Sequence, residues 1–337
     1  MTDKKTPDSL HRRGFIQQAS LGIVAAGFLG APAIAQQTQE PSAPPLQDPA
    51  AKYPKPPFPE QKQPWPGLAS KMTPRPDHGE TSYRGSGRLR GRRALITGGD
   101  SGMGRAAAIA YAREGADVAI NYLPAEEPDA QEVVQLIRAA GRKAVALPGD
   151  IRNEEFCQKL VADAVKNLGG LDIVVCNAGR QQTHASILDI STEQFDWTMK
   201  TNIYAPFWIL KAALPHLPPG AAIIATASEQ AYDPSPDLYD YAQTKAATMN
   251  YVKSLAKQLG PKGIRVNGVA PGPIWTPLQI SGGATQEKIR NFGGDTVFKR
   301  PGQPAELAST YVELAANDGS SFTTGQIYGI SGGKGQP

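Results

Sequence analysis

The chain has 337 residues, of which 40% are hydrophobic and 20% charged, a composition typical of a globular protein with one large domain. Its formal net charge of +4 is small and dispersed, and no Lys/Arg block with interleaved aromatic residues is present, which excludes an ordinary nucleic-acid-binding protein. The cysteines, Cys157 and Cys176, and the four histidines match no zinc-binding spacing, so we expect no metal site. Because Cys176 ends a predicted strand and Cys157 lies on a predicted helix, we expect two free buried thiols; the alternative is a disulfide between them.

Residues 1–35 have the pattern of an export signal. Arg12 and Arg13, followed by Phe15, precede a weakly apolar run rich in Ala and Gly that ends in a small-residue cleavage pattern at 33–35. This segment resembles a bacterial twin-arginine signal peptide, which takes folded proteins through the membrane. We therefore expect a periplasmic protein that uses the twin-arginine machinery and has no membrane contact once mature. The alternatives are an ordinary secretory signal and an inefficient signal that leaves the active protein in the cytoplasm.

Residues 36–87 are dominated by Pro, Gln and Lys and have no apolar periodicity, which predicts an extended arm. Trp65, Leu68 and Met72 could anchor this arm on the domain or on a neighbouring subunit. The alternative is a flexible spacer, and the sequence does not distinguish the two.

Residues 88–337 alternate between short β-branched runs and stretches of helical period. This pattern predicts a single α/β domain of Rossmann type, a doubly wound seven-stranded parallel sheet with helices on both faces. The expected strands are residues 93–97, 117–122, 143–147, 172–176, 222–225, 265–269 and 326–330. The expected helices include residues 104–114, 129–140, 154–168, 192–214 and 241–259.

A glycine-rich turn joins the first predicted strand to the first predicted helix, with the spacing Gly-x-x-x-Gly-x-Gly. Such a turn lets the backbone approach a pyrophosphate, and the helix N-terminus then supplies free N–H groups. We expect a dinucleotide in contact with this turn, at Gly98, Ser101, Gly102, Met103 and Gly104.

The end of the second predicted strand bears on the choice of dinucleotide. Proteins that prefer NAD usually carry an acid there for the ribose 2′-hydroxyl, and residues 119–123 hold neither an acid nor a following Lys or Arg. We therefore expect NADP(H) to be favoured over NAD(H), with Tyr122 beside the cofactor. Arg105 is the nearest cation in the turn, and we expect it on an exposed helix face. Asp150, followed by Ile151 at the third strand end, could bind the adenine amino group.

Tyr241 and Lys245 lie four residues apart at the start of a predicted helix, so their side chains share one face. A phenol titrates near pH ~10, and an adjacent ammonium group lowers its pKa toward the working range. The pair alone is common on helix surfaces. Ser228, at the end of the fifth strand, offers a hydroxyl for a substrate oxygen, and Asn202 is a polar residue in an apolar helix that is expected to have a specific partner.

In order and spacing, these motifs resemble those of the short-chain dehydrogenase/reductase family. The matching residues are Thr97-Gly98-x-x-x-Gly102-x-Gly104, Asn177-Ala178-Gly179, Asn202, Ser228, Tyr241-x-x-x-Lys245 and Pro271-Gly272. The resemblance covers residues 89–333 and looks closest to a bacterial subgroup of glucose/ribitol-dehydrogenase-like and aldehyde-reductase-like members. It implies an NAD(P)(H)-dependent oxidoreductase that transfers hydride between nicotinamide and an aldehyde, ketone, sugar or alcohol.

The resemblance also implies residue roles. Tyr241 would be the acid/base, Ser228 would orient the reacting oxygen, Lys245 would tune Tyr241 and hold the ribose, and Asn202 would position a water in a proton relay. The further cofactor contacts that it implies are Asn177, Ala178, Gly179, Pro271, Gly272, Ile274 and Thr276. Residues 180–184 and 278–298 would select the substrate, and the protein would be a dimer or tetramer. The alternative is a non-catalytic nucleotide-binding sensor or scaffold, which loss of Ser228, Tyr241 or Lys245 would favour; none of the three is lost.

Overall fold

Seven short apolar runs form the strands of one sheet in the computed structural model, which describes residues 46–334. All neighbouring strands are parallel, in the order β3-β2-β1-β4-β5-β6-β7. This arrangement confirms the expected Rossmann-type sheet. The strand order reverses between β1 and β4, because β2 and β3 are added on one side of β1 and β4 to β7 on the other. In sheets of this kind, ligands bind at the carboxyl ends of the strands, at the point of reversal. The strands are β1 (Arg93–Thr97), β2 (Asp117–Tyr122), β3 (Ala144–Pro148), β4 (Ile173–Cys176), β5 (Ala222–Thr226), β6 (Arg265–Pro271) and β7 (Ile327–Ile330).

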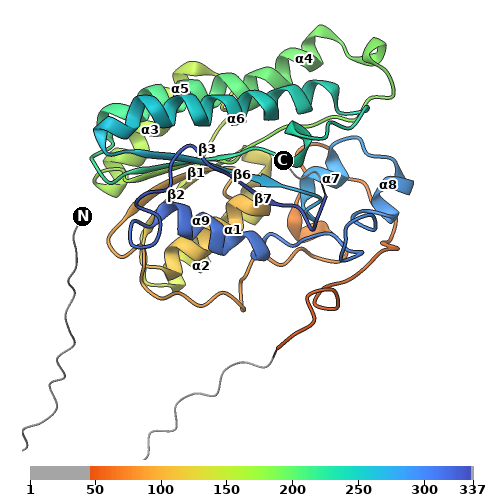
Figure 1. The fold of residues 1–337 in the computed structure, drawn as a ribbon, viewed down its shortest axis with the longest axis horizontal. Helices are drawn as coiled ribbons and strands as arrows, with labels where there is room; N and C mark the ends of the chain where they lie inside the picture. Colours follow the sequence, from red (N-terminus) through yellow and green to blue (C-terminus); the bar gives the residue numbers. More distant parts are fainter. Residues whose placement is uncertain (1–45, 335–337) are drawn as a thin grey trace, which may run out of the picture. The chain divides into compact units, whose positions relative to one another are not determined.

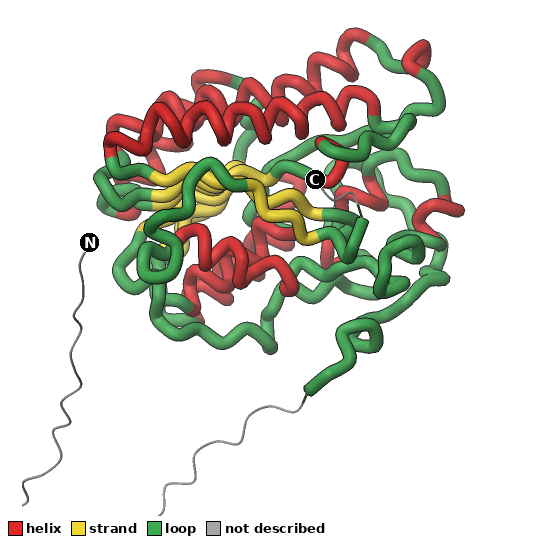
Figure 2. The backbone as a smooth tube through the Cα atoms, in the orientation of Figure 1, coloured by secondary structure: helices red, strands yellow, loops and turns green. Residues whose placement is uncertain are grey.

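Helices cover both faces of the sheet (Figures 1 and 2). One face carries α1 (Gly102–Arg113), α2 (Glu127–Ala139) and α9 (Ala305–Ala315). The other carries α3 (Glu154–Leu168), α4 (Thr192–Met199), α5 (Ala205–Ala213) and α6 (Tyr239–Leu259). Two short helices, α7 (Pro277–Ser281) and α8 (Gln286–Arg290), lie beyond β6 in the segment expected to select the substrate, and neither they nor α9 are among the helices predicted above.

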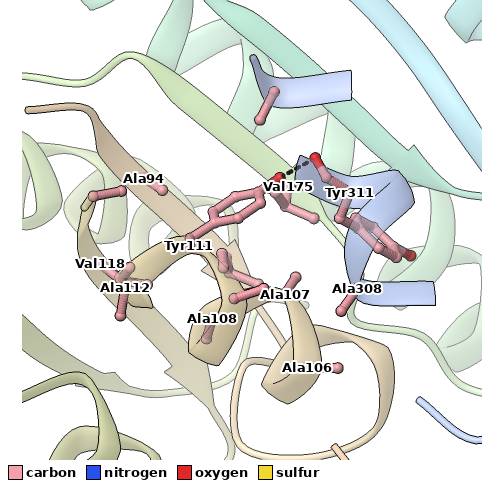
Figure 3. Close-up of a cluster of buried hydrophobic side chains, with 14 of the residues drawn as sticks. Ala94, Ala106, Ala107, Ala108, Tyr111, Ala112, Val118, Val175, Ala308 and Tyr311 are labelled. Carbon is pink, nitrogen blue, oxygen red and sulfur yellow. Dashed lines mark hydrogen bonds between the residues drawn. The ribbon is translucent and has the colours of Figure 1, made fainter. Parts of the chain in front are cut away.

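Alternation along the strands divides the core into two layers. Ala94 and Ile96 pack on the side of α1 and α9, whereas Leu95 packs on the side of α3 and α5. The first layer is built on alanines of α1, which allow this helix to lie close to the sheet, and on two buried tyrosines (Figure 3). The Tyr111 hydroxyl donates to the Tyr311 carbonyl oxygen at 3.0 Å, which ties α1 to α9.

The helix predicted over residues 192–214 is not continuous. Between α4 and α5, residues Lys200–Tyr204 form a π-helical turn that contains Asn202. Asn202 is buried and hydrogen-bonded outside its own helix, which accounts for the local widening. Single π-turns of this kind are frequent at functional sites.

The arm packs against the domain of its own chain. Phe58 stacks on Trp275, with 4.4 Å between ring centroids, and the Trp275 indole donates to the Pro74 carbonyl oxygen at 2.8 Å. The Asp129 carboxylate accepts hydrogen bonds from the Ala69 and Ser70 backbone at 2.6 and 3.3 Å. From residue 47 onward the arm is therefore part of the folded unit and is not a spacer.

The export signal expected at residues 1–35 lies outside the described residues. Within residues 46–334, no helix has the length and apolar character that a membrane span requires.

Candidate active site

The turn between β1 and α1 has a geometry that only glycine adopts without strain. Gly98 and Gly102 have φ angles of +62° and +52°, in the left-handed region. A Cβ atom on Gly104 would lie 1.9 Å from the Gly98 carbonyl oxygen, so a larger residue there would displace the turn. Ser101 is the N-cap of α1 and makes no side-chain cap hydrogen bond, which leaves the N–H groups of the first turn available to an anion.

Asn177 fixes this turn from the neighbouring strand end. Its amide nitrogen donates to the carbonyl oxygens of Thr97 and Gly98 at 3.2 and 3.1 Å, and its oxygen accepts from the Thr226 hydroxyl at 3.2 Å. The Asn177 side chain therefore fixes the shape of the glycine turn.

A cavity of about 800 Å³ opens at the carboxyl ends of the strands. Its wall brings together all the predicted site residues except Gly104 and Asn202. Its wall includes Gly98, Ser101, Gly102, Met103, Tyr122, Asp150, Ile151, Asn177, Ala178, Gly179, Ser228, Tyr241, Lys245, Pro271, Gly272, Ile274 and Thr276.

Two acids that the sequence interpretation missed line the cavity near the end of β2. Asp100, in the glycine turn, is 1% exposed, and its Oδ2 has no hydrogen-bond partner among the described residues. Glu126 accepts a hydrogen bond from the Leu123 backbone at 2.8 Å. Burial raises the pKa of both carboxyl groups, and the charge of Asp100 raises the pKa of Glu126 further. Glu126 lies three residues beyond the segment 119–123, where an acid for the ribose is usually found.

Arg105 does not lie on an exposed helix face, so that expectation is wrong. It is 1% exposed and donates to Glu80 and Glu132 at 3.1 and 2.8 Å. Because these carboxylates hold its guanidinium away from the cavity wall, Arg105 is not placed to bind a phosphate there.

The α6 pair is buried. Tyr241 and Lys245 are 7% and 4% exposed, and the Lys245 ammonium donates to the Thr226 carbonyl oxygen at 2.8 Å. Burial lowers the pKa of Lys245 to about 8. Burial and the charge of Glu229 raise the pKa of Tyr241 to about 12, against the lowering effect of a hydrogen bond with Ser228. The net shift is upward, whereas we expected Lys245 to tune the pKa of Tyr241 downward, and burial is its largest cause.

Asn202 connects the strand end after β4 to α6. Its oxygen accepts from the Arg180 N–H at 2.8 Å, and its nitrogen donates to the Arg180 carbonyl at 2.9 Å and to the Thr244 hydroxyl at 3.0 Å. Thr244 directly precedes Lys245, so Asn202 joins the Arg180 backbone to the residue beside Lys245.

Glu229 is a further acid that the motifs do not indicate. It directly follows Ser228, lines the cavity and is 7% exposed. Burial raises its pKa to about 7, although the nearby positive charge of Lys334 opposes this shift.

Comparisons with known proteins agree with this geometry. The family described as enoyl-(acyl carrier protein) reductase matches residues 98–334. The chain is 59% identical to the uncharacterized oxidoreductase YghA of Escherichia coli, over 86% of this chain and 98% of that protein. It is 42% identical to NADPH-dependent aldehyde reductase 1, chloroplastic, of Arabidopsis thaliana, over 80% and 94%. A solved short-chain dehydrogenase from Burkholderia cenocepacia, in complex with NADP, is 35% identical with a TM-score of 0.67, over 73% and 98%.

The fold and the cavity define an enzyme of the oxidoreductase class that uses a nicotinamide dinucleotide. The chain belongs to the short-chain dehydrogenase/reductase family, as its motifs suggested.

Proposed function

We propose that this protein reduces the carbonyl group of a small aldehyde, ketone or sugar, and oxidises the corresponding alcohol, with Tyr241 as the acid/base. The observation that carries this proposal is the presence of Tyr241, Ser228 and Lys245 in the wall of the same cavity as the glycine turn. The similarity to an aldehyde reductase supports a carbonyl substrate.

The glycine turn between β1 and α1 suits a dinucleotide, because its glycines leave room for a pyrophosphate beside the uncapped first turn of α1. Ala178, Gly179 and Thr276 would then border the nicotinamide half. When bound, the nicotinamide supplies or accepts the hydride. The residues of this chain position the reacting carbon and handle the proton.

In the reductive direction, Ser228 donates a hydrogen bond to the carbonyl oxygen and Tyr241 holds the proton that this oxygen receives. A pKa of about 12 keeps the phenol protonated at neutral pH, which suits a proton donor. The ammonium of Lys245, 5.3 Å from the centre of the Tyr241 ring, stabilises the negative charge left on the phenol oxygen.

For the cofactor, we propose that the protein accepts NADP(H), as the sequence and the NADP complex of a similar protein suggest, and also NAD(H). Asp100 and Glu126 border the place where the adenosine ribose is held in this fold. When ionised they repel a 2′-phosphate, and when protonated they admit it. Their raised pKa values therefore make NADP(H) competitive at the lower end of the neutral range.

For location, we propose export by the twin-arginine machinery to the periplasm, supported by Arg12, Arg13 and the cleavage pattern at residues 33–35. Because a free nicotinamide pool is not expected there, the exported protein would retain its cofactor and recycle it with a second substrate. Mass spectrometry of ligands released from periplasmic protein tests this. A preparation without nucleotide that also binds NADPH weakly would contradict it.

We also propose that the protein forms a homodimer or tetramer. Light scattering, which measures the mass of the particle in solution, tests this proposal.

The central test of function is Tyr241→Phe. We expect kcat for aldehyde reduction to fall about 10²–10⁴-fold, because the proton donor is lost while the ring and its packing remain. NADPH binding, followed by its fluorescence, should change little. Thr248→Ser, at a buried hydroxyl of the same helix outside the cavity, is the matched control. Unchanged reductase activity in the Phe variant would contradict the role of Tyr241.

A further inference from the structure

The arm supplies part of the cavity wall. Pro56, Trp65, Pro66 and Gly67 line the same cavity as the glycine turn and Tyr241, although they precede the Rossmann domain in the sequence. No family motif identified above includes these residues. The enzyme's site is thus built from two parts of the chain.

The arm meets the cavity on its substrate side. A Cβ atom on Gly67 would lie 3.2 Å from both Pro277 and Ser281 of α7, the helix that directly follows Thr276. The Gln63 N–H donates to the Ile280 carbonyl oxygen at 3.4 Å. Since α7 begins the segment expected to select the substrate, Trp65 stands beside this segment.

A second contact links Trp65 to Arg180, the residue that follows Gly179 at the cavity wall. The Arg180 guanidinium lies 5.0 Å from the centre of the Trp65 ring and 3.8 Å from that of Trp197, which also lines the cavity. Arg180 is 5% exposed and donates to Gln194 at 2.7 Å. Its Nε and Nη1 have no hydrogen-bond partner among the described residues, so the aromatic faces provide much of the stabilisation of this buried cation.

The backbone of Arg180 is the segment that Asn202 holds on both its N–H and its carbonyl oxygen. Arg180 directly follows Gly179, where a Cβ atom would lie 3.6 Å from the Lys245 ammonium nitrogen. Through Arg180, the Trp65 ring therefore contacts the segment that borders Lys245.

We propose that Trp65 is a specificity-determining residue, whose ring, with Leu278 and Phe292, receives the apolar part of a carbonyl substrate. Leu278 and Phe292 line the cavity from the segment that the arm contacts, and Pro56 and Pro66 line it from the arm, so both segments contribute apolar residues to the wall. The wall also carries the charged residues Glu229, Asp237 and Lys288, of which the last two pair with each other. The substrate class is then an aldehyde or ketone that carries an alkyl chain or an aromatic ring. This inference rests on the proposed carbonyl reductase activity.

The experiment compares kcat/KM for propanal, hexanal and benzaldehyde in the full-length wild-type protein and in Trp65→Ala. Hexanal and benzaldehyde should lose about 10-fold or more, as expected for loss of an apolar contact surface, while propanal changes less than about threefold. Trp65→Phe keeps an aromatic face and should retain most of the selectivity. Tyr53→Ala, which removes another aromatic contact of the arm outside this cavity, should leave the three ratios unchanged.

Equal losses for the three aldehydes in Trp65→Ala, or no loss for any, would overturn the inference. A loss of selectivity in Tyr53→Ala equal to that in Trp65→Ala would also overturn it, since attachment of the arm would then be the cause. If Trp65→Ala does not fold, kcat/KM for the three aldehydes is compared in Trp65→Phe and Trp65→Leu instead. Selectivity should then be largely kept in Trp65→Phe and reduced in Trp65→Leu, and equal selectivity in both would overturn the inference. A wild-type protein inactive on every aldehyde would instead contradict the proposed function, so the two failures are distinguishable.

Discussion

Burial acts on Tyr241 and Lys245 in opposite directions, and it leaves both groups in the state that carbonyl reduction needs at neutral pH. Tyr241 stays protonated because burial raises its pKa to about 12. Burial lowers the pKa of Lys245 to about 8, well below the usual range of a lysine, because it removes hydration from the ammonium group.

The first prediction concerns the pH dependence of the two directions of reaction. Above about pH 8 reductive kcat should fall, since the neutral form of Lys245 no longer stabilises the phenolate that forms as Tyr241 gives up its proton. Alcohol oxidation needs Tyr241 to accept a proton and should rise with pH. Initial rates from pH 6 to 10 in both directions test this. In Lys245→Arg, whose cation stays charged, the decline near pH 8 should disappear from the residual activity. An unchanged decline would assign it to another group.

The second prediction concerns the acids near the end of β2. As pH rises, Asp100 and Glu126 lose protons, and the added negative charge opposes the 2′-phosphate of NADPH. The ratio of kcat/KM for NADPH to that for NADH should therefore fall between pH 6 and 9, by on the order of tenfold for one unit charge near a phosphate.

Glu126→Gln removes one of these charges and should make the ratio less dependent on pH. Glu127→Gln is the matched control. The Glu127 carboxylate accepts a hydrogen bond from the Tyr122 hydroxyl, and Glu127 is not part of the cavity wall. Equal slopes in the wild type and in Glu126→Gln would show that this pair does not determine cofactor choice.

At the scale of single elements, the π-helical turn between α4 and α5 directs Asn202 toward Arg180 and Thr244. Asn202→Ala would leave the buried N–H and carbonyl of Arg180 without their partners. Each lost partner costs about 1–3 kcal/mol, so we expect the free energy of unfolding to fall by about 2–6 kcal/mol. Urea denaturation measures this change, and kcat should fall with it because the segment beside Lys245 is released.

Thr248→Ala is the control for this prediction. The Thr248 hydroxyl is also buried, but it donates only to the Thr244 carbonyl oxygen of its own helix at 2.9 Å. The loss should be about 1 kcal/mol or less. A similar loss in both variants would mean that Asn202 has no special positioning role.

The elements that follow a local pattern were predictable from the sequence. The strands of the sheet and the glycine turn depend on residues that are adjacent in the chain, and the predicted strand positions agree with the structure to within two residues at each end. The π-turn was not predictable, because it depends on contacts of Asn202 with residues 22 and 42 positions away. Asp100 lies within the predicted glycine turn, but its burial and its proximity to Glu126 result from folding, so the sequence did not indicate this pair of acids.

The contacts of Trp65 were even less predictable from the sequence. A Pro-rich segment without periodicity gives no indication of what its aromatic residues contact, so the arm was equally consistent with a spacer. Its contacts with Arg180 and α7 span more than one hundred residues of sequence.

At the scale of the whole molecule, the arm and the segment over residues 275–292 form a small apolar cluster of their own, outside the two layers of the main core. It contains Phe58 and Met72 of the arm and Trp275, Ile280 and Ile289 of the domain. Hydrogen bonds between Gln61 and Gln286 at 2.9 and 3.2 Å join the same two segments. We infer that the arm and this segment are stabilised together and that one does not loosen without the other.

Phe58→Ala tests this coupling. The substitution removes the ring stacked on Trp275, and a buried Phe→Ala change costs about 3–5 kcal/mol where the surroundings do not collapse. Because the small cluster supplies few other contacts, we expect local opening instead of global unfolding. Hydrogen exchange should accelerate in residues 56–75 and in residues 277–292 alike, while β1, β4 and β5 keep their protection. Tyr53→Phe, which removes only the hydrogen bond to Asp77 elsewhere on the arm, should leave both segments protected. Faster exchange confined to the arm would contradict the coupling, since the substrate-side segment would then be held by the Rossmann domain alone.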